Sequence, residues 1–301
     1  MLLDCAIIGG GPAGLSAALV LGRARRSAIL FDDQRPRNRV ARASHGFITR
    51  DGAAPGEIRK IAHEELGRYP SVRLRMSRVA SVAREEDGSF TLIDEAGANW
   101  QAKRLLLAAG LKELLPDIEG LAAFYGTSLF CCAYCDGWEL RDRPLVLIAG
   151  NDHTFHLAKT VHNWSKDLLV CTNGYDSLTP EEEETLRGHG IRIDHREIGR
   201  LEGDGGQLSA VRFADGETAA CAGGFVAERL RQAVPFAEEL GCAMTPYGGI
   251  ETDAAGRTNV PGVYAAGDAT CIMPAQLIVA AADGSRAAIG INEDMTDETF
   301  A

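Results

Sequence analysis

Two cysteines three positions apart, Cys132 and Cys135, carry the chemistry that the sequence shows most clearly. A Cys-x-x-Cys pair can close a disulfide and reopen it, so it can hold electrons as a dithiol and release them as a disulfide. Asp136 directly follows the second cysteine, where its carboxyl group could protonate a leaving thiolate or deprotonate an incoming thiol. Cys131 precedes the pair, and the sequence leaves a strained Cys131–Cys132 pairing open.

Half of a zinc site and inert structural thiols are the alternatives for this pair. Zinc normally needs a second Cys/His pair at ligand spacing, and the nearest candidates, His153 and His156, match that spacing poorly. We therefore expect a redox pair and no metal. The remaining cysteines are scattered, and we expect them to fill the cores: Cys5, Cys171, Cys221, Cys242 and Cys271.

The composition excludes several classes of partner. The chain has 301 residues and a formal net charge of −11, which argues against nucleic acids and anionic membranes because both require basic patches. No stretch approaches the roughly 18 apolar residues of a membrane span. The first residues lack the basic region of a signal peptide, and scattered cysteines are typical of a reducing compartment. We expect a cytoplasmic protein.

A glycine loop near the N-terminus predicts a dinucleotide site. Residues 9–14 read Gly-Gly-Gly-Pro-Ala-Gly, between a short apolar strand at 6–8 and a helix from Leu15 to about Arg25. Such glycines let the backbone approach a pyrophosphate, whose charge the helix N-terminus meets. The next strand ends at Asp32, where a carboxylate can bind ribose hydroxyls. The candidate ligands within the loop are Gly9, Gly11, Pro12, Ala13 and Gly14.

Two segments after this loop are further candidates for the cofactor site. A basic run at 35–42 leads to His45. This run is either a solvated loop or a segment that places Arg37 and His45 beside the cofactor. A buried strand at 104–110 ends in small residues, Ala109 among them, as expected for a strand that passes close to a ligand.

A Gly-Asp pair near the C-terminus completes the predicted site. Gly267 and Asp268 follow a buried strand and precede a helix that we predict over 275–290. Asp268 could hydrogen-bond a flavin ribityl chain. The helix that begins near Gln276 could direct its positive end at the isoalloxazine.

A second dinucleotide-like unit starts at about residue 144. It has a buried strand, a helix predicted over 154–164 and another strand at 168–171. Its loop at 149–154 reads Ala-Gly-Asn-Asp-His-Thr, so two of the three glycine positions are lost. The next strand should end in an acid for NAD or in basic residues for NADP, yet residues 172–174 are Thr-Asn-Gly. We therefore do not expect nicotinamide binding.

Over its whole length the chain resembles the low-molecular-weight thioredoxin reductases. Three motifs carry the resemblance in the right order: residues 9–14, residues 132–137, and residues 265–268 followed by Gln276. The resemblance implies an α/β fold of two Rossmann-like, three-layer domains, the second inserted into the first. It also implies FAD as the cofactor and a homodimer as the assembly.

The resemblance further implies domain bounds and residue roles. Residues 1–113 and 229–301 would form the FAD-binding domain, and residues 114–228 would form an inserted, degenerate NAD(P)-type domain. Cys135 would face the flavin, and Cys132 would exchange with the substrate sulfur. Asp136 would be the acid/base.

Departures from the family pattern set the expected function. Members that use NADPH carry G-G-G-[DN]-[ST]-A and then His-Arg-Arg, which residues 149–154 and 172–174 lack. Residues 37–38 and 45–52 instead resemble the NADPH-independent branch, which contains the dithiol oxidases of gliotoxin and holomycin biosynthesis. In that branch this loop, including the position of His45, contributes to the flavin site.

We therefore expect an FAD-dependent dithiol oxidase that forms a disulfide in a small molecule, with O2 as electron acceptor and no NADPH. One alternative is an NADPH-independent reductase of thioredoxin or a similar protein disulfide, fed by ferredoxin, flavodoxin or another donor. Another alternative, of a different class, is a flavin-bound redox sensor. The natural substrate does not follow from the sequence, because fold and motif define the sulfur chemistry and leave the pocket unspecified.

Overall fold

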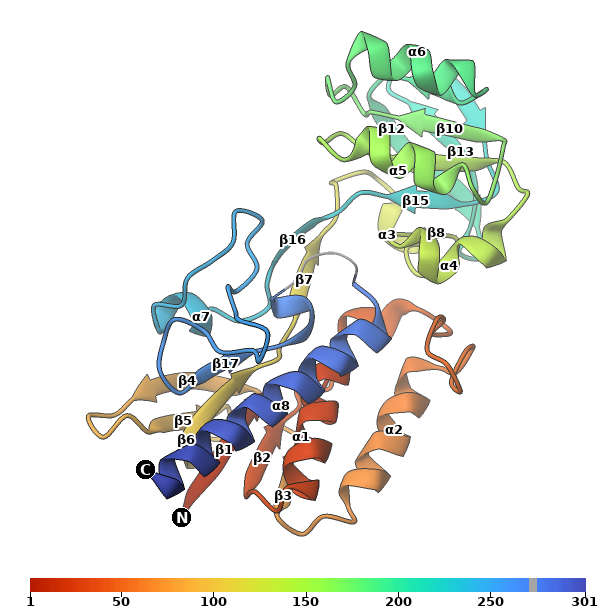
Figure 1. The fold of residues 1–301 in the computed structure, drawn as a ribbon. Helices are drawn as coiled ribbons and strands as arrows, with labels where there is room; N and C mark the ends of the chain where they lie inside the picture. Colours follow the sequence, from red (N-terminus) through yellow and green to blue (C-terminus); the bar gives the residue numbers. More distant parts are fainter. Residues whose placement is uncertain (271–274) are drawn as a thin grey trace. The chain divides into compact units, whose positions relative to one another are not determined.

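The computed structural model describes residues 1–270 and 275–301, and this part of the chain forms two compact units (Figure 1). Both units are α/β structures, as the sequence predicts, and the chain passes through the second unit before it completes the first. The first unit comprises residues 1–39, 46–113 and 230–301, and the second comprises residues 40–45 and 114–229.

A seven-stranded sheet forms the centre of the first unit. Its order is β3-β2-β1-β6-β5-β4, and β17 also pairs with β6. The pairings among β3, β2, β1, β6 and β17 are parallel, whereas those of β4 and β5 are antiparallel. Strands β7 and β16 form a separate pair. The strands are β1 (Leu2–Ile8), β2 (Ala28–Phe31), β3 (Val72–Arg75), β4 (Val79–Arg84), β5 (Phe90–Asp94), β6 (Asn99–Leu107), β7 (Leu111–Leu114), β16 (Arg229–Gln232) and β17 (Val263–Ala265).

Three helices lie along one face of this sheet, α1, α2 and α8 (Figure 1). Successive side chains of a strand point to opposite faces, so Ile7 of β1 packs with residues of α1 and α8, whereas Ile8 packs with residues of β4 and β5. The helices are α1 (Pro12–Arg23), α2 (Pro55–Leu66), α7 (Phe236–Glu239) and α8 (Leu277–Phe300), with 3-10 turns η1 (Arg37–Val40) and η2 (Gly267–Ala269).

Two helices of the first unit differ from the sequence prediction. Helix α1 begins at Pro12, not at Leu15, because proline fits the first helical position. Helix α8 continues to Phe300, so the predicted end at Gly290 is wrong. A Cβ at Gly290 would lie 2.6 Å from the carbonyl oxygen of Ala255, so this glycine permits close packing in mid-helix. Neither α8 nor another helix of the described residues is long and apolar enough to cross a bilayer.

The second unit is built on a five-stranded parallel sheet in the order β11-β10-β9-β15-β8, with a separate antiparallel sheet, β12-β13-β14. The strands are β8 (Leu129–Phe130), β9 (Leu145–Ile148), β10 (Leu168–Cys171), β11 (Arg192–Asp194), β12 (Ile198–Asp204), β13 (Gln207–Phe213), β14 (Thr218–Ala220) and β15 (Gly224–Val226). The helices are α3 (Leu121–Phe124), α4 (Ala133–Leu140), α5 (Thr154–Val161) and α6 (Pro180–Gly188).

Both faces of the five-stranded sheet are covered. Leu147 of β9 packs with residues of α4, α5 and α6, whereas Ile148 packs with residues of β12 and β13. Helix α5 ends at Val161, so the predicted continuation to Trp164 is wrong. Helix α6 begins with a capping box, in which the side chains of Thr179 and Glu182 bond each other's backbone N–H groups. The second unit is therefore a three-layer structure of helices, parallel sheet and antiparallel sheet.

Four of the cysteines that we predicted to fill the cores are buried, namely Cys5, Cys171, Cys221 and Cys242. Burial raises the pKa of the Cys221 thiol to about 11. Such a thiol stays protonated at neutral pH and is a poor nucleophile. Cys271 lies outside the described residues.

Candidate active site

The Cys132–Cys135 pair lies at the start of α4 in the second unit. Strand β8 ends at Phe130, and Cys132 is the N-cap residue of the helix. The structure joins Cys132 and Cys135 in a disulfide with their Cα atoms 5.3 Å apart. One helical turn brings residues at this spacing together. After the disulfide opens, a thiolate at Cys132 would be stabilised by the positive end of α4.

Helix α4 packs against Trp164 through a buried glycine and a largely exposed tyrosine. A Cβ at Gly137 would lie 2.8 Å from the ring of Trp164, so the glycine lets this ring approach the helix closely. The ring of Tyr134 packs edge-to-face on Trp164, with the ring centroids 5.3 Å apart. This packing fixes the helix, while the disulfide at its N-terminus stays partly exposed.

Asp136 lies beside the disulfide and has an unusual proton affinity. Burial raises the pKa of its carboxyl group to about 7; the charge of Glu139 also raises this pKa, whereas His45 lowers it. A carboxyl group that titrates near neutral pH can both donate and accept a proton. Asp136 was predicted from its position after Cys135, whereas Glu139 was not predicted. The available signal was its i+3 spacing from Asp136 on a helix.

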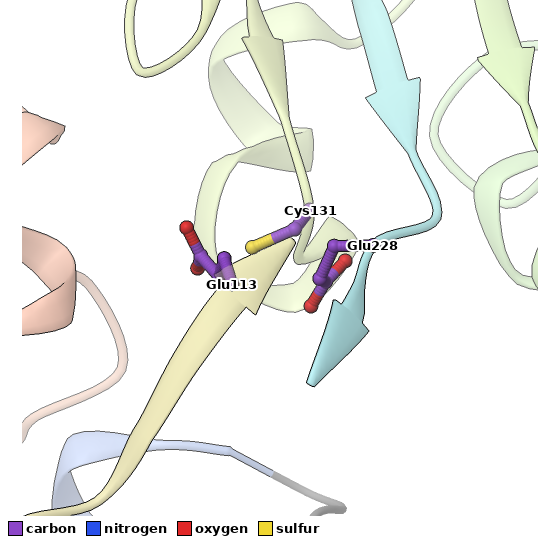
Figure 2. A group of neighbouring side chains, drawn as sticks. All are labelled: Glu113, Cys131 and Glu228. Atoms are coloured by element: carbon purple, nitrogen blue, oxygen red, sulfur yellow. The ribbon is translucent and has the colours of Figure 1, made fainter. Parts of the chain in front are cut away.

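Cys131 is not part of the disulfide, because the structure pairs Cys132 with Cys135. It directly follows β8, and Glu228 lies just beyond the parallel neighbouring strand β15 (Figure 2). The Cys131 sulfur and a carboxylate oxygen of Glu228 lie within 4.8 Å of each other. Glu113, also labelled in Figure 2, belongs to the first unit. The carboxyl ends of β8 and β15 therefore carry a thiol and an acid beside the redox pair.

In the glycine loop of the first unit, two glycines are tightly packed and a third faces open space. Gly9 has a φ of +121°, and a Cβ there would lie 2.2 Å from the carbonyl oxygen of Ala108. A Cβ at Gly14 would lie 1.9 Å from the carbonyl oxygen of Gly9. At Gly11, by contrast, no described atom lies within 4 Å of such a Cβ. Because this opening lies at the N-terminus of α1, the loop fits a dinucleotide pyrophosphate.

Asp32 ends β2 beside this loop and is almost fully buried. Its carboxylate accepts hydrogen bonds from the Gln34 N–H at 2.7 Å and from Arg59 at 2.5 Å, and His63 Nε2 lies 3.5 Å away. Arg59 Nε and His63 Nε2 are buried and have no hydrogen-bond partner among the described residues. Both residues border a cavity of about 430 Å3. These donors fit a polar ligand such as a ribose. Arg59 and His63 were not predicted as site residues from the sequence.

Arg37 links two distant segments of the first unit. Its guanidinium donates to Glu113 and to Asp268, each at 3.0 Å. Gly267, which precedes Asp268, has a φ of +71°, and a Cβ there would lie 2.8 Å from the Cβ of Ala13. The structure therefore brings the glycine loop, the basic run and the Gly-Asp pair together.

The other predicted cofactor residues are distributed over both units. Ala109 directly follows the residue that packs on Gly9. Gln276 is the N-cap residue of α8 and makes no side-chain cap among the described residues. His45 belongs to the second unit, where its Nε2 lies 3.7 Å from a carboxylate oxygen of Glu139. The structure thus places His45 with α4 and Asp136.

The loop after β9, which matches a nicotinamide-binding loop, is closed by its own hydrogen bonds. Asn151 Oδ1 accepts from the His153 N–H at 3.0 Å, and Thr154 Oγ1 donates to the Asn151 carbonyl oxygen at 2.6 Å. Its glycine, Gly150, lies against the ring of Tyr175, and a Cβ there would be 2.5 Å from a ring carbon. The Asn151 side-chain oxygen, the His153 N–H and the Thr154 hydroxyl are therefore bonded within the loop.

The polar side chains that follow the next strand, β10, are also bonded within the protein. Thr172 is fully buried, and its hydroxyl lies 3.2 Å from His195 Nδ1. The other ring nitrogen of His195 lies 2.7 Å from Glu183. Asn173 Oδ1 accepts a hydrogen bond from the Ile198 N–H at 2.7 Å. The two polar side chains at this strand end are therefore bonded to the protein, and neither carries a positive charge for a 2′-phosphate.

Comparisons with known proteins agree with this geometry. Residues 3–284 match the family model of the pyridine nucleotide-disulphide oxidoreductases. Thioredoxin reductase aclD of Aspergillus oryzae is 31% identical, over 96% of this chain and 95% of the relative. The solved structure of the Bacillus anthracis protein TrxB is 44% identical with a TM-score of 0.95, and covers 98% of this chain and 99% of its own.

A second solved structure, that of HlmI, is 33% identical with a TM-score of 0.93 and covers 99% of this chain and 94% of its own. These similarities extend over both units. They confirm the fold class that the sequence predicts. The chain therefore belongs to the pyridine nucleotide-disulphide oxidoreductase family, as a flavoprotein of the thioredoxin reductase type.

Proposed function

We propose that this protein is an FAD-dependent dithiol oxidase, which forms a disulfide in a small-molecule dithiol with molecular oxygen as electron acceptor and without NADPH. One observation carries this proposal: the redox disulfide and the first glycine loop are intact, whereas the second nucleotide loop is bonded to itself. A thiol–disulfide centre without a nicotinamide site can take its electrons from a substrate dithiol in place of NADPH.

The first unit would hold the FAD, with residues 1–113 and 229–301 as the FAD-binding domain. Gly11 and the start of α1 would receive the pyrophosphate, and Asp32 with Arg59 and His63 would receive the adenosine ribose. The chemistry that bound FAD supplies is acceptance of two electrons from the reduced cysteine pair and their delivery to oxygen as hydrogen peroxide.

The second unit would carry out the thiol–disulfide exchange. A substrate thiolate attacks the Cys132 sulfur, the Cys132–Cys135 bond breaks, and Cys135 leaves as a thiolate. The second substrate thiol then attacks the substrate sulfur of this mixed disulfide, which releases the product disulfide and Cys132 as a thiolate. Two electrons have then moved from the substrate to the cysteine pair.

Asp136 would manage the protons of these two steps. As a carboxylate it accepts the proton of an incoming substrate thiol, and as a carboxylic acid it protonates a departing thiolate. Its pKa of about 7 suits both roles at neutral pH. The exposed rings of Tyr134 and Trp138 lie on the same helix and offer apolar contact area to a small substrate.

An anaerobic titration of the FAD-loaded protein tests this proposal. Visible flavin absorbance is followed during addition of dithiothreitol and, separately, of NADPH. The oxidase predicts bleaching by dithiothreitol and not by NADPH, then recovery of colour in air with release of peroxide. Rapid bleaching by NADPH would overturn the proposal. Reduction only by a protein donor such as ferredoxin would indicate the reductase instead, and reduction by neither would indicate a redox sensor.

We also propose that the protein is a cytoplasmic homodimer. The resemblance to the family supports the dimer, and scattered cysteines that form no secreted disulfide framework support the location. Sedimentation velocity of the FAD-loaded protein tests the assembly state, and a monomer at micromolar concentration would contradict it.

A further inference from the structure

Asp136 has a second acid and a histidine beside it. Asp136 and Glu139 are three positions apart on α4, so their side chains emerge on the same side of the helix. His45, from the segment at 40–45 of the same unit, places Nε2 3.7 Å from Glu139 Oε1. Among the described residues, the charges that act on the pKa of Asp136 come from Glu139, on its own helix, and from His45, which lies against Glu139.

We propose that Glu139 and His45 are positioning residues that control when Asp136 holds and releases its proton during thiol–disulfide exchange. The inference rests on the proposed exchange at Cys132–Cys135 and goes further by naming what regulates its acid/base.

The physical reason is that the exchange uses both protonation states of Asp136. A carboxyl group that works in both directions needs a proton affinity close to the ambient pH. The negative charge of Glu139 disfavours ionised Asp136 and so raises its pKa, whereas His45 lowers this pKa. Glu139 and His45 also face each other, so each partly offsets the effect of the other on Asp136. The pKa of Asp136 therefore depends on both residues together.

A surface ion pair is the alternative explanation for this contact. The His45 and Glu139 side chains are 23% and 45% exposed, and pairs of this kind contribute about 0–1 kcal/mol to folding. Such a pair would affect stability slightly and would leave the titration of Asp136 unchanged. The pH dependence of the exchange therefore distinguishes the two explanations.

The experiment measures the rate at which dithiothreitol opens the Cys132–Cys135 disulfide in the FAD-loaded protein under anaerobic conditions. Samples are quenched and alkylated, and the modified cysteines are counted by mass spectrometry from about pH 5 to about pH 9, a range around the ordinary Asp and His pKa values. Each rate is divided by the thiolate fraction of dithiothreitol. The corrected rate should fall with pH as Asp136 ionises, because the attacking thiolate needs the carboxylic acid form of Asp136 to protonate the leaving Cys135 thiolate. Asp136→Asn should remove this fall.

Glu139→Gln removes a negative charge, so the fall should move to lower pH by about one unit, and Glu139→Lys should move it further. His45→Gln removes the side chain that lowers the pKa of Asp136, so the fall should move to higher pH by about one unit. Glu184→Gln, the same charge change at an exposed position of α6, should leave the fall where it is. Opposite shifts for positions 139 and 45 are the result that supports the proposal.

Unchanged midpoints in the Glu139 variants, or shifts of the same sign at both positions, would overturn it. The Glu139 variants alone decide the matter if His45→Gln does not fold. The exchange assay contains no oxygen, so it does not depend on the proposed oxidase function. If that function fails, a separate assay shows no oxygen consumption, while the exchange still shows the opposite shifts.

Discussion

The raised pKa of Asp136 predicts that this carboxyl group destabilises the folded protein at alkaline pH. The folded-state pKa is about 7, against an ordinary value of 3.8, mainly because burial disfavours the carboxylate. Between these two values the folded state binds more protons than the unfolded state, so stability falls as pH rises. At 1.36 kcal/mol per pKa unit, the full loss above pH 7 is about 4 kcal/mol.

Asp136→Asn removes this titration and should therefore stabilise the protein more at high pH than at low pH. The gain in the free energy of unfolding should be larger at about pH 8 than at about pH 5, by about 2.5 kcal/mol. Urea unfolding followed by circular dichroism, with FAD in excess, measures the gain at each pH. The contributions of other titrating groups to the free energy of unfolding cancel, because each comparison is between two variants at one pH.

Asp152→Asn is the matched control, since it makes the same charge change at an exposed position of the second unit. Its effect on the free energy of unfolding should be small and equal at both pH values. If Asp136→Asn also gives equal effects at both pH values, the carboxyl group does not titrate near neutrality. The assignment of Asp136 as a two-way acid/base would then lose its physical basis.

Three further predictions concern the redox pair and the two nucleotide loops. Cys135→Ser should abolish flavin bleaching by dithiothreitol while FAD stays bound, and bleaching at the native rate would contradict the assignment of the pair. Gly9→Ala should weaken FAD retention at least tenfold in equilibrium dialysis, because its Cβ would lie 2.2 Å from the Ala108 carbonyl oxygen; native affinity would contradict the packing described. Restoring glycine at Ala149 and Asn151 together should not restore bleaching by NADPH, since the strand end still lacks cations, and rapid bleaching would refute this account of the second loop.

The sequence was sufficient to predict features that depend on short-range geometry. The fold class follows from strands, helices and glycine loops that repeat in order. The disulfide follows from a three-residue spacing that one helical turn can close. Helix ends were less certain, because Gly290 could mark either the end of a helix or a close packing contact within one.

Contacts between residues far apart in the chain depended on the tertiary structure. Arg37 bonds Asp268 across 231 positions, and neither residue carries a local signal for the other. His45 lies in a basic loop that resembles part of a flavin site, yet its contact with Glu139 in the second unit arises only once the chain has folded. The sequence by itself determined which residues can do chemistry. The tertiary structure decided which charges surround Asp136, because burial and neighbouring charges, not residue type, determine where a carboxyl group titrates.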